Sequence, residues 1–322
     1  MKIFLILMTL LLSLQAQNIG ASVYENIIFK NIQKATQNIK QLTALVENNA
    51  SKEVVKEAFI QTMISWKKVE ALYLAADLDE EYIDIPRYID VFHEGKEDIY
   101  KQLDRILRSS DRVEIALFKN STKSINALEY LLFKPSQKTQ RQNEMLVYIL
   151  KHMDKHLKTI EVFYHDNQAL FKKDEKKLNA IIMNALIESS YKLKEWRVGD
   201  PAGLSRKYKN DAKDARSEYP ISELSYKAIE AILLTHQAMI GKQKFVNFSK
   251  VIVAADAEDE LFRAQNNIKN ALKYLQLAKG YDFSSKEIQA LYKELTELHN
   301  VYFISLITAL KISSKILDSD GD

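Results

Sequence analysis

The sequence predicts an all-α fold made of two helical-bundle halves. Of its 322 residues, 47% are hydrophobic and 10% aromatic, which is enough apolar material for one large core or two ordinary ones. Only 7 glycines and 4 prolines are present, so the chain offers few turns and favours long helices over a many-stranded sheet. Apolar residues also recur at helical spacing along most of its length.

The first residues have the layout of a secretory signal. Lys2 precedes an apolar run from Ile3 to Leu14, which ends at the small residue Ala16. We therefore expect a signal peptide over residues 1–16 and export to the periplasm or cell envelope. No later stretch approaches the roughly 20 apolar residues of a spanning helix, so we expect no transmembrane segment in the mature chain. The chain has no cysteine, which excludes disulfides and a lipid-modified cysteine.

The charge balance does not indicate a nucleic-acid partner. The formal net charge is +3, and removal of the signal takes away one lysine and no acid. Charges of both signs are interspersed, and no basic stripe of the kind that binds phosphate backbones is present.

Apolar periodicity predicts five helices in the N-terminal half. Their expected bounds are 23–46, 51–76, 88–107, 125–133 and 140–171. A short connection lies at 48–51 and a longer one at 77–87, because Pro86 lacks an amide donor and disfavours a helical conformation at Ile85. Pro135 ends the fourth helix.

Four helices are expected in the C-terminal half. Their expected bounds are 174–197, 222–240, 256–279 and 284–317. Ser284 and Glu287 have the spacing of a capping box. The stretch 198–221 is expected to be irregular, because it holds two glycines, Gly199 and Gly203, and two prolines.

The two halves share a short sequence pattern. Residues 124–133 align without gaps to residues 225–234, with Glu129 opposite Glu230, which suggests an internal duplication. The expected division is a signal over 1–16, an N-terminal bundle over 17–172 and a C-terminal bundle over 173–322.

Asn126 and Glu129 are the most informative residues for function. They are the only polar residues in the helix 125–133, and their spacing of three places them on one face. A carboxylate in such an apolar helix is costly to bury alone. Glu129 therefore needs a basic partner, a bound cation or a solvated cleft.

The stretch from Asn126 to Phe133 resembles the signature of imelysin-like proteins, an exported group in which a Gly-x-His-x-x-Glu motif precedes a Tyr-Leu-Leu-Phe-type run. Further segments that resemble this family are Trp66–Glu70, Glu195–Gly203 and Ser217–Ser225. Together these segments span most of the mature chain.

The resemblance implies two helical halves with a cleft between them, a place in the cell envelope, an association with iron uptake and, from the family's name, metallopeptidase activity. This chain departs from the motif, with Ser124 in place of the glycine and Asn126 in place of the histidine. A catalytic zinc ion needs about three protein ligands and an open position, and a carboxamide replaces an imidazole poorly. A harder divalent cation could accept the oxygens of Asn126 and Glu129, which remain the candidate metal ligands.

The stretch 198–221 and its flanks supply the other wall of the predicted cleft. Its glycines permit a close approach of a ligand, although a plain connector needs no such role. Glu70 is expected to join a polar network. The predicted cleft residues are Ser124, Asn126, Glu129, Arg197, Asp200, Arg216, Glu218 and Glu230.

Two other groups could hold a metal but are more typical of solvated helix faces. Asp90, His93 and Glu97 would share one face of a continuous helix, which Gly95 weakens. The pair at 152 and 156 consists of histidines without the glutamate of the zinc-protease pattern.

The sequence therefore favours an exported imelysin-like protein that binds a metal ion or a metal-linked ligand without peptide hydrolysis. One alternative is a metal-dependent peptidase whose further ligands come from distant residues. Another is a helical scaffold for a second envelope protein, which would require an exposed apolar patch.

Overall fold

A computed structural model describes residues 18–95, 97–135 and 139–313 of the chain. These residues form helices and connecting segments and contain no strand, so the all-α prediction is confirmed. The predicted signal over 1–16 lies outside the described residues. Within the described ranges, none of the helices combines the length and the apolar character that crossing a membrane requires.

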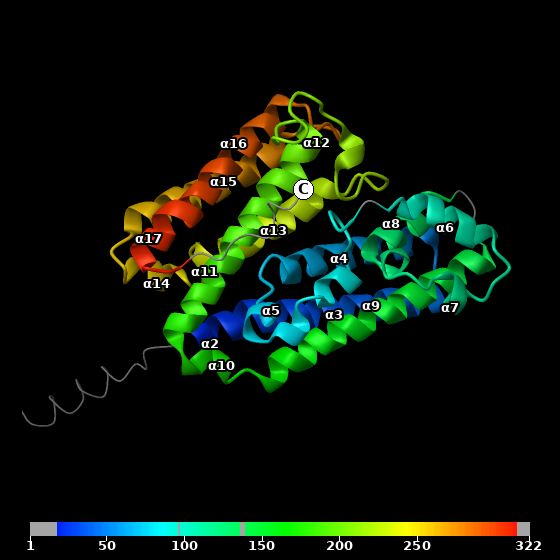
Figure 1. The fold of residues 1–322 in the computed structure, drawn as a ribbon, viewed down its shortest axis with the longest axis horizontal. Helices are drawn as coiled ribbons and strands as arrows, with labels where there is room; N and C mark the ends of the chain where they lie inside the picture. Colours follow the sequence, from blue (N-terminus) through cyan, green and yellow to red (C-terminus); the bar gives the residue numbers. More distant parts are fainter. Residues whose placement is uncertain (1–17, 96, 136–138, 314–322) are drawn as a thin grey trace, which may run out of the picture.

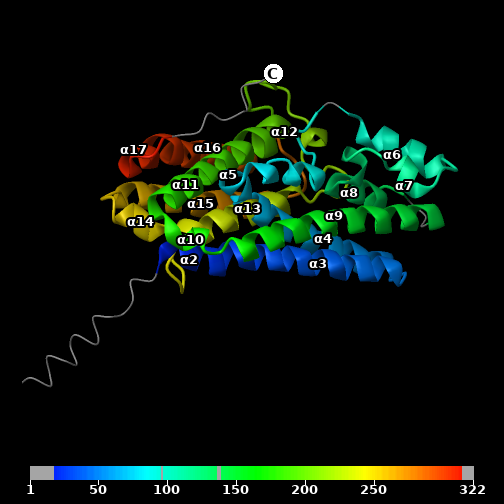
Figure 2. The same ribbon diagram turned by 60° about the horizontal axis from the view of Figure 1, so that its bottom comes forward.

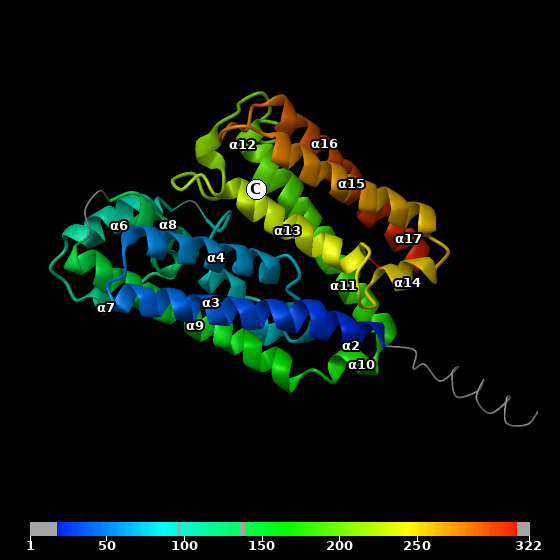
Figure 3. The ribbon, with the colours of Figure 1, turned by 180° about the vertical axis from the view of Figure 1, so that it is seen from behind.

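Three long helices form the body of the N-terminal half. Helix α3 (Phe29–Glu47) packs against both α4 (Lys52–Glu70) and α9 (Gln140–Asp166), and the three run side by side (Figures 1 and 3). At one end lie α6 (Ile99–Arg108), α7 (Val113–Ala116) and α8 (Ile125–Phe133). The shorter elements are α2 (Ile19–Val23), η1 (Tyr24–Ile28), α5 (Ala75–Leu78), η2 (Glu80–Tyr82), η3 (Ile85–Tyr88), η4 (Ser121–Lys123) and α10 (Leu170–Lys173).

The C-terminal half is a second group of helices, inclined to the first (Figure 1). Its long helices are α11 (Glu175–Lys192), α13 (Ser225–Ile240), α15 (Glu258–Leu277) and α16 (Lys286–Asn300). Its shorter elements are η5 (Leu193–Gly199), α12 (Asp200–Ala202), η6 (Asp214–Arg216), α14 (Ser249–Val253), η7 (Val301–Leu306) and α17 (Ile307–Leu310). In Figure 2, α14 and α17 lie at the opposite end of the molecule from α6 and α7.

The apolar core is continuous between the halves. Helix α13 packs against α4 on one side and against α15 on the other. One large cluster of buried side chains joins Ile32 and Met63 of the N-terminal half to Met239 and Tyr302 of the C-terminal half. A smaller cluster lies mainly within the C-terminal half. The division between residues 172 and 173 therefore stays a prediction, because the buried side chains of the two halves form one shared cluster.

The predicted helix over 88–107 is wrong in its first half. The described residues 89–95 and 97–98 are irregular, and α6 begins only at Ile99. His93 and Gly95 have φ values of 64° and 87°, which a right-handed helix does not allow. The predicted helix face with Asp90, His93 and Glu97 therefore does not form, because these residues lie on a loop.

Other helix ends also differ from prediction. The helix expected over 140–171 ends at Asp166, and α10 follows a short break. The helix expected to end at Arg197 continues through η5 and α12 to Ala202. Gly203 ends it with φ of 66°, and a Cβ atom there would lie 2.6 Å from the backbone nitrogen of Ala212.

At the last helix, the capping residue is Ser285 and not Ser284. Ser285 Oγ accepts a hydrogen bond from Ile288 N, whereas Ser284 Oγ donates to Asp282 Oδ1. Helical structure ends at Leu310, earlier than the predicted 317. Residues 314–317 lie outside the described ranges.

Candidate functional site

Helix α8 places its two polar side chains inside the protein. Ser124 begins the helix with an extended backbone, and its Oγ accepts a hydrogen bond from Ala127 N. Every residue from Ile125 to Leu132 is buried. Ser124 is therefore a capping residue, and Asn126 and Glu129 face the junction between the two halves.

Glu129 is completely buried, and only one of its two carboxylate oxygens accepts hydrogen bonds from the described residues. Its Oε1 accepts hydrogen bonds from Ile221 N at 3.1 Å, from Ser222 N at 2.8 Å and from Ser222 Oγ at 2.7 Å. Its Oε2 has no hydrogen-bond partner among the described residues. Burial raises the pKa of Glu129 from 4.5 to about 7, although the three hydrogen bonds oppose that rise. The donors come from the loop after α12, so this carboxylate joins the two halves.

Asn126 fixes the loop that follows η3. Its Oδ1 accepts a hydrogen bond from Val91 N at 3.2 Å, and Ile125 N donates to Ile89 O at 2.8 Å. These two bonds hold the segment around Asp90 against the start of α8. Asn126 thus already has a structural partner for the oxygen that was expected to bind a metal.

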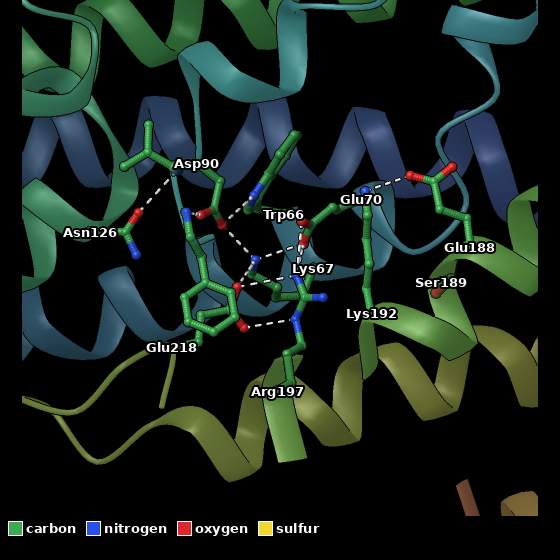
Figure 4. A network of polar contacts seen from close by, with 12 residues as sticks. Trp66, Lys67, Glu70, Asp90, Asn126, Glu188, Ser189, Lys192, Arg197 and Glu218 are labelled. Atoms are coloured by element: carbon green, nitrogen blue, oxygen red, sulfur yellow. Dashed lines mark hydrogen bonds and ion pairs between the residues drawn. The ribbon is translucent and has the colours of Figure 1, made fainter. Parts of the chain in front are cut away.

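Next to this segment lies a buried cluster of five charged side chains from four parts of the chain (Figure 4). Lys67 and Glu70 come from α4, Asp90 from the loop, Arg197 from η5 and Glu218 from the segment before α13. Lys67 Nζ lies 2.6 Å from Glu70 Oε2 and 2.5 Å from Asp90 Oδ2, and it also contacts Glu218 Oε1. Three carboxylates and two cations leave the cluster with one net negative charge.

Arg197 closes the cluster on the side of the C-terminal half. Its Nη2 lies 2.8 Å from Glu70 Oε1, and its Nε lies 2.9 Å from Glu218 Oε2. The π-helical turn of η5 is wider than an α-helical turn and carries this side chain inward, where it is 4% exposed. Arg197 therefore ties α4 to the loop segment of Glu218.

The electrostatics keep the lysine charged. Burial by itself lowers the pKa of Lys67, but the carboxylates of Asp90, Glu218 and Glu70 outweigh it and hold that pKa above its ordinary value. For Glu218 burial has the larger effect and raises its pKa, although the charges of Arg197 and Lys67 act to lower it. A strongly held ammonium among carboxylates is the main electrostatic feature of the junction.

Comparison with known proteins identifies the family. The sequence model of the imelysin family, named as peptidase M75, matches residues 24–302. The chain belongs to the imelysin family.

Two solved structures share the fold. An imelysin-like protein from Psychrobacter arcticum 273-4 is similar with a TM-score of 0.75 and 16% identity, over 92% of this chain and 96% of that one. A putative iron-regulated protein A precursor from Parabacteroides distasonis ATCC 8503 is similar with a TM-score of 0.69 and 11% identity, over 91% and 94%. No curated protein matches the chain.

Other predicted cleft residues lie around this cluster or away from it. Asp200 Oδ2 is 3.0 Å from Nε2 of His93, whose ring stacks on Trp196 with centroids 4.6 Å apart. Arg216 pairs with Asp211 and lies over the ring of Tyr208, outside the cluster. The structure thus joins Arg197 with Glu218 but does not bring every predicted cleft residue together.

Glu230 does not reproduce the setting of Glu129. It lies partly exposed on α13, and none of its hydrogen bonds or ion pairs within the described ranges reaches another candidate residue. The two aligned acids therefore have different environments, and the internal duplication stays a hypothesis.

Among the other candidate metal groups, Glu97 has an ordinary ion-pair partner, whereas Nε2 of His152 has no hydrogen-bond partner among the described residues. Glu97 lies 2.7 Å from Lys119 Nζ, in an exposed ion pair. The rings of His152 and His156 are in contact at 4.5 Å, and burial lowers the pKa of His152 to about 4. No acidic side chain is paired with either of these histidines in the described part of the chain.

The surface hollows of the described residues include two that are not lined by the predicted cleft residues. One of about 460 Å³ lies beside the loop at Val91 and Gly95, and one of about 510 Å³ lies along α6. Glu129 itself is fully buried, so the predicted cleft around it stays a prediction.

The sequence analysis missed Lys67 and Asp90 as members of this imelysin site. One signal was available, because Lys67 lies four residues after the buried Met63 and next to the buried Trp66, on the apolar face of α4. A lysine at such a position requires a buried acid. The α4 sequence supplies one acidic partner, Glu70, but Asp90 and Glu218 were not predictable from it, because they lie on distant segments.

Proposed function

We propose that this imelysin-family protein is exported to the cell envelope and binds a metal ion or a metal-linked ligand at the junction of its two halves, in support of iron uptake. The observation that carries the proposal is Glu129, a fully buried carboxylate with one oxygen that lacks a partner among the described residues. Buried carboxylates are normally paired or coordinate a metal. One structural neighbour is named as a putative iron-regulated protein A precursor, which supports iron as the metal.

The composition of the junction favours a hard cation. The charge of Glu218 acts on Glu129 and raises its pKa, and the cluster to which Glu218 belongs has one net negative charge. Oxygen donors suit iron, manganese, magnesium and calcium ions better than soft thiophilic ions. A bound cation would also remove the cost of keeping the Glu129 carboxylate ionised, because it supplies the charge that burial withholds.

Peptide hydrolysis is not part of the proposal. A zinc peptidase needs imidazole or carboxylate ligands around an open water position. At the motif position this chain has Asn126, whose oxygen accepts from Val91 N. The nearest imidazole on the adjoining loop, His93, contacts Asp200 and stacks on Trp196.

Equilibrium dialysis followed by elemental analysis tests the proposal. Chelator-treated protein is dialysed against ferrous iron under anaerobic conditions, and separately against manganese, calcium and zinc ions. We expect the wild-type chain to retain iron in a fixed ratio and Glu129→Gln to lose it while keeping its helical circular dichroism. The matched control is Glu230→Gln, the same change at the partly exposed counterpart, which should bind as the wild type does.

The proposal fails if the wild-type chain retains no metal, or if Glu129→Gln retains as much as the wild type. Cleavage of unfolded casein by the zinc-loaded protein, lost in Glu129→Gln, would replace it with the peptidase alternative. Cell fractionation tests export separately, because a chain found only in the cytoplasm contradicts the predicted signal.

A further inference from the structure

The side chain of Lys67 occupies the centre of a group of carboxylates (Figure 4). One oxygen each of Glu70, Asp90 and Glu218 lies within 4.8 Å of the others. The ammonium contacts all three acids, and the exposed fraction of the Lys67 side chain is 0%. The three acids come from separate segments of the chain, so the tertiary fold, and not local sequence, brings them together.

An ammonium and a metal ion place similar demands on such a group. Lysine offers three N–H donors and no acceptor, and here each donor has its own carboxylate. Hard divalent cations take the same type of oxygen ligand at somewhat shorter distances. The position of Nζ is therefore the position that a coordinated cation would occupy.

A further buried oxygen is within reach of the charges of these carboxylates. The hydroxyl of Tyr219 is fully buried and has no hydrogen-bond partner within the described residues. Lys67 Nζ lies 5.7 Å from the centre of the Tyr219 ring, and after burial the charges of Asp90, Glu218 and Glu70 are what raise the pKa of its hydroxyl most. This unpartnered hydroxyl is a polar group in the same region that is independent of the acids.

The remaining contacts hold the ligand oxygens in place without the lysine. Trp66 Nε1 donates to Asp90 Oδ2 at 3.1 Å, and Phe92 N donates to Asp90 Oδ1 at 2.9 Å. Arg197 donates to both oxygens of Glu70, at 2.8 and 2.9 Å, and to both oxygens of Glu218, at 2.9 and 3.2 Å, so these two carboxylates keep a guanidinium partner without the lysine. Without the ammonium, three carboxylates and one guanidinium would leave two net negative charges, which one divalent cation balances.

We propose that Glu70, Asp90 and Glu218 form a divalent-cation site that the chain fills with the ammonium of Lys67. In the wild-type protein this site is closed to free divalent ions, and removal of the ammonium opens it. The inference concerns a position separate from Glu129 and holds whether or not Glu129 binds a metal.

The decisive variant is Lys67→Met. Methionine keeps the apolar stem of the side chain but ends one atom earlier and carries no charge, so it vacates the position of Nζ. The matched control is Lys68→Met, which removes the same charge from the neighbouring, partly exposed residue. The double variant Lys67→Met with Asp90→Asn removes one ligand from the opened site.

Manganese binding is measured by electron paramagnetic resonance and equilibrium dialysis, and thermal unfolding is followed with manganese and with a chelator. We expect Lys67→Met to bind one more manganese ion per chain than the wild type, and its unfolding midpoint to rise with manganese. Lys68→Met and the double variant should show no such gain. If Lys67→Met is unfolded in chelator, recovery of its helical signal on addition of manganese is the expected result.

The inference is overturned if Lys67→Met, folded or not, gains neither manganese nor stability from manganese. It is also overturned if the double variant keeps the gain. A wild-type chain that binds no metal would refute the function proposed for Glu129. The site at Lys67 would still be tested, because its test is the manganese that Lys67→Met binds in addition to the wild type. The two results are therefore independent.

Discussion

The replacement of Glu129 by glutamine should change how the stability of the protein depends on pH. The carboxyl group is fully buried, and burial raises its pKa from 4.5 to about 7. The folded protein therefore holds a proton on Glu129 in a pH range in which the unfolded chain has already lost it. The contribution of Glu129 to the free energy of unfolding is therefore fully present below the pKa that this residue has in the unfolded chain. It is lost as the pH rises through the folded-state pKa of about 7.

The size of the effect follows from the pKa difference. A pKa that moves from 4.5 to about 7 corresponds to about 3 kcal/mol, at about 1.4 kcal/mol for each pH unit. Glutamine has no proton to lose, so the variant lacks this penalty. The free energy of unfolding of Glu129→Gln minus that of the wild type should rise by about 3 kcal/mol between about pH 4.5 and pH 8.

The assay is urea unfolding at several pH values in the presence of a chelator. The difference between the two proteins isolates Glu129, because both retain the groups whose charges act on or respond to it: Glu218, Tyr100, Tyr219 and Tyr281. Glu230→Gln is the control and should give a difference that does not depend on pH. A flat difference for Glu129→Gln, or one that falls as the pH rises, would refute this account of the buried carboxylate.

Two further predictions concern the cluster and the loop that supplies part of it. Arg197→Met leaves the buried Glu218 and the partly exposed Glu70 without their guanidinium, so it should lower the free energy of unfolding by about 3–5 kcal/mol in urea titrations. An unchanged stability would contradict the network. Gly203→Ala places a Cβ atom 2.6 Å from the backbone nitrogen of Ala212 at a φ of 66°, so it should cost at least about 1 kcal/mol, whereas equal unfolding midpoints would contradict the turn.

Helix content was predictable from sequence, but the course of the loops was not. The periodicity of α3, α4 and α13 is a local property, and each was predicted as a helix. The bounds agree closely for α13, whereas α4 ends at Glu70 and not at the predicted Ala76. The failure at 88–107 has a specific cause. Asp90 has a sequence context typical of a helix but lies on a loop. There its carboxylate contacts Lys67, Trp66 and the amide of Phe92.

The candidate site was predictable only in part. The lone acid Glu129 was recognisable because a carboxylate within an apolar helix is unusual, and Arg197 and Glu218 were recognisable in the segments that resemble imelysins. Glu70 was recognised as a residue of a polar network, but Lys67 and Asp90 were not placed beside Arg197 and Glu218. Lys67 lies 151 residues from Glu218 in the chain and 23 from Asp90, and no local pattern connects such positions.

The sequence by itself determined the helical class, the family and the identity of the buried acid, because each depends on residue types at short, regular spacing. Only the tertiary structure decided that Lys67 lies among three carboxylates and that Glu129 accepts its hydrogen bonds from the segment at Ile221 and Ser222. The physical reason is that a buried charge must find its counter-charge or donor in space. The residue that supplies it can come from any part of the chain that packing brings near.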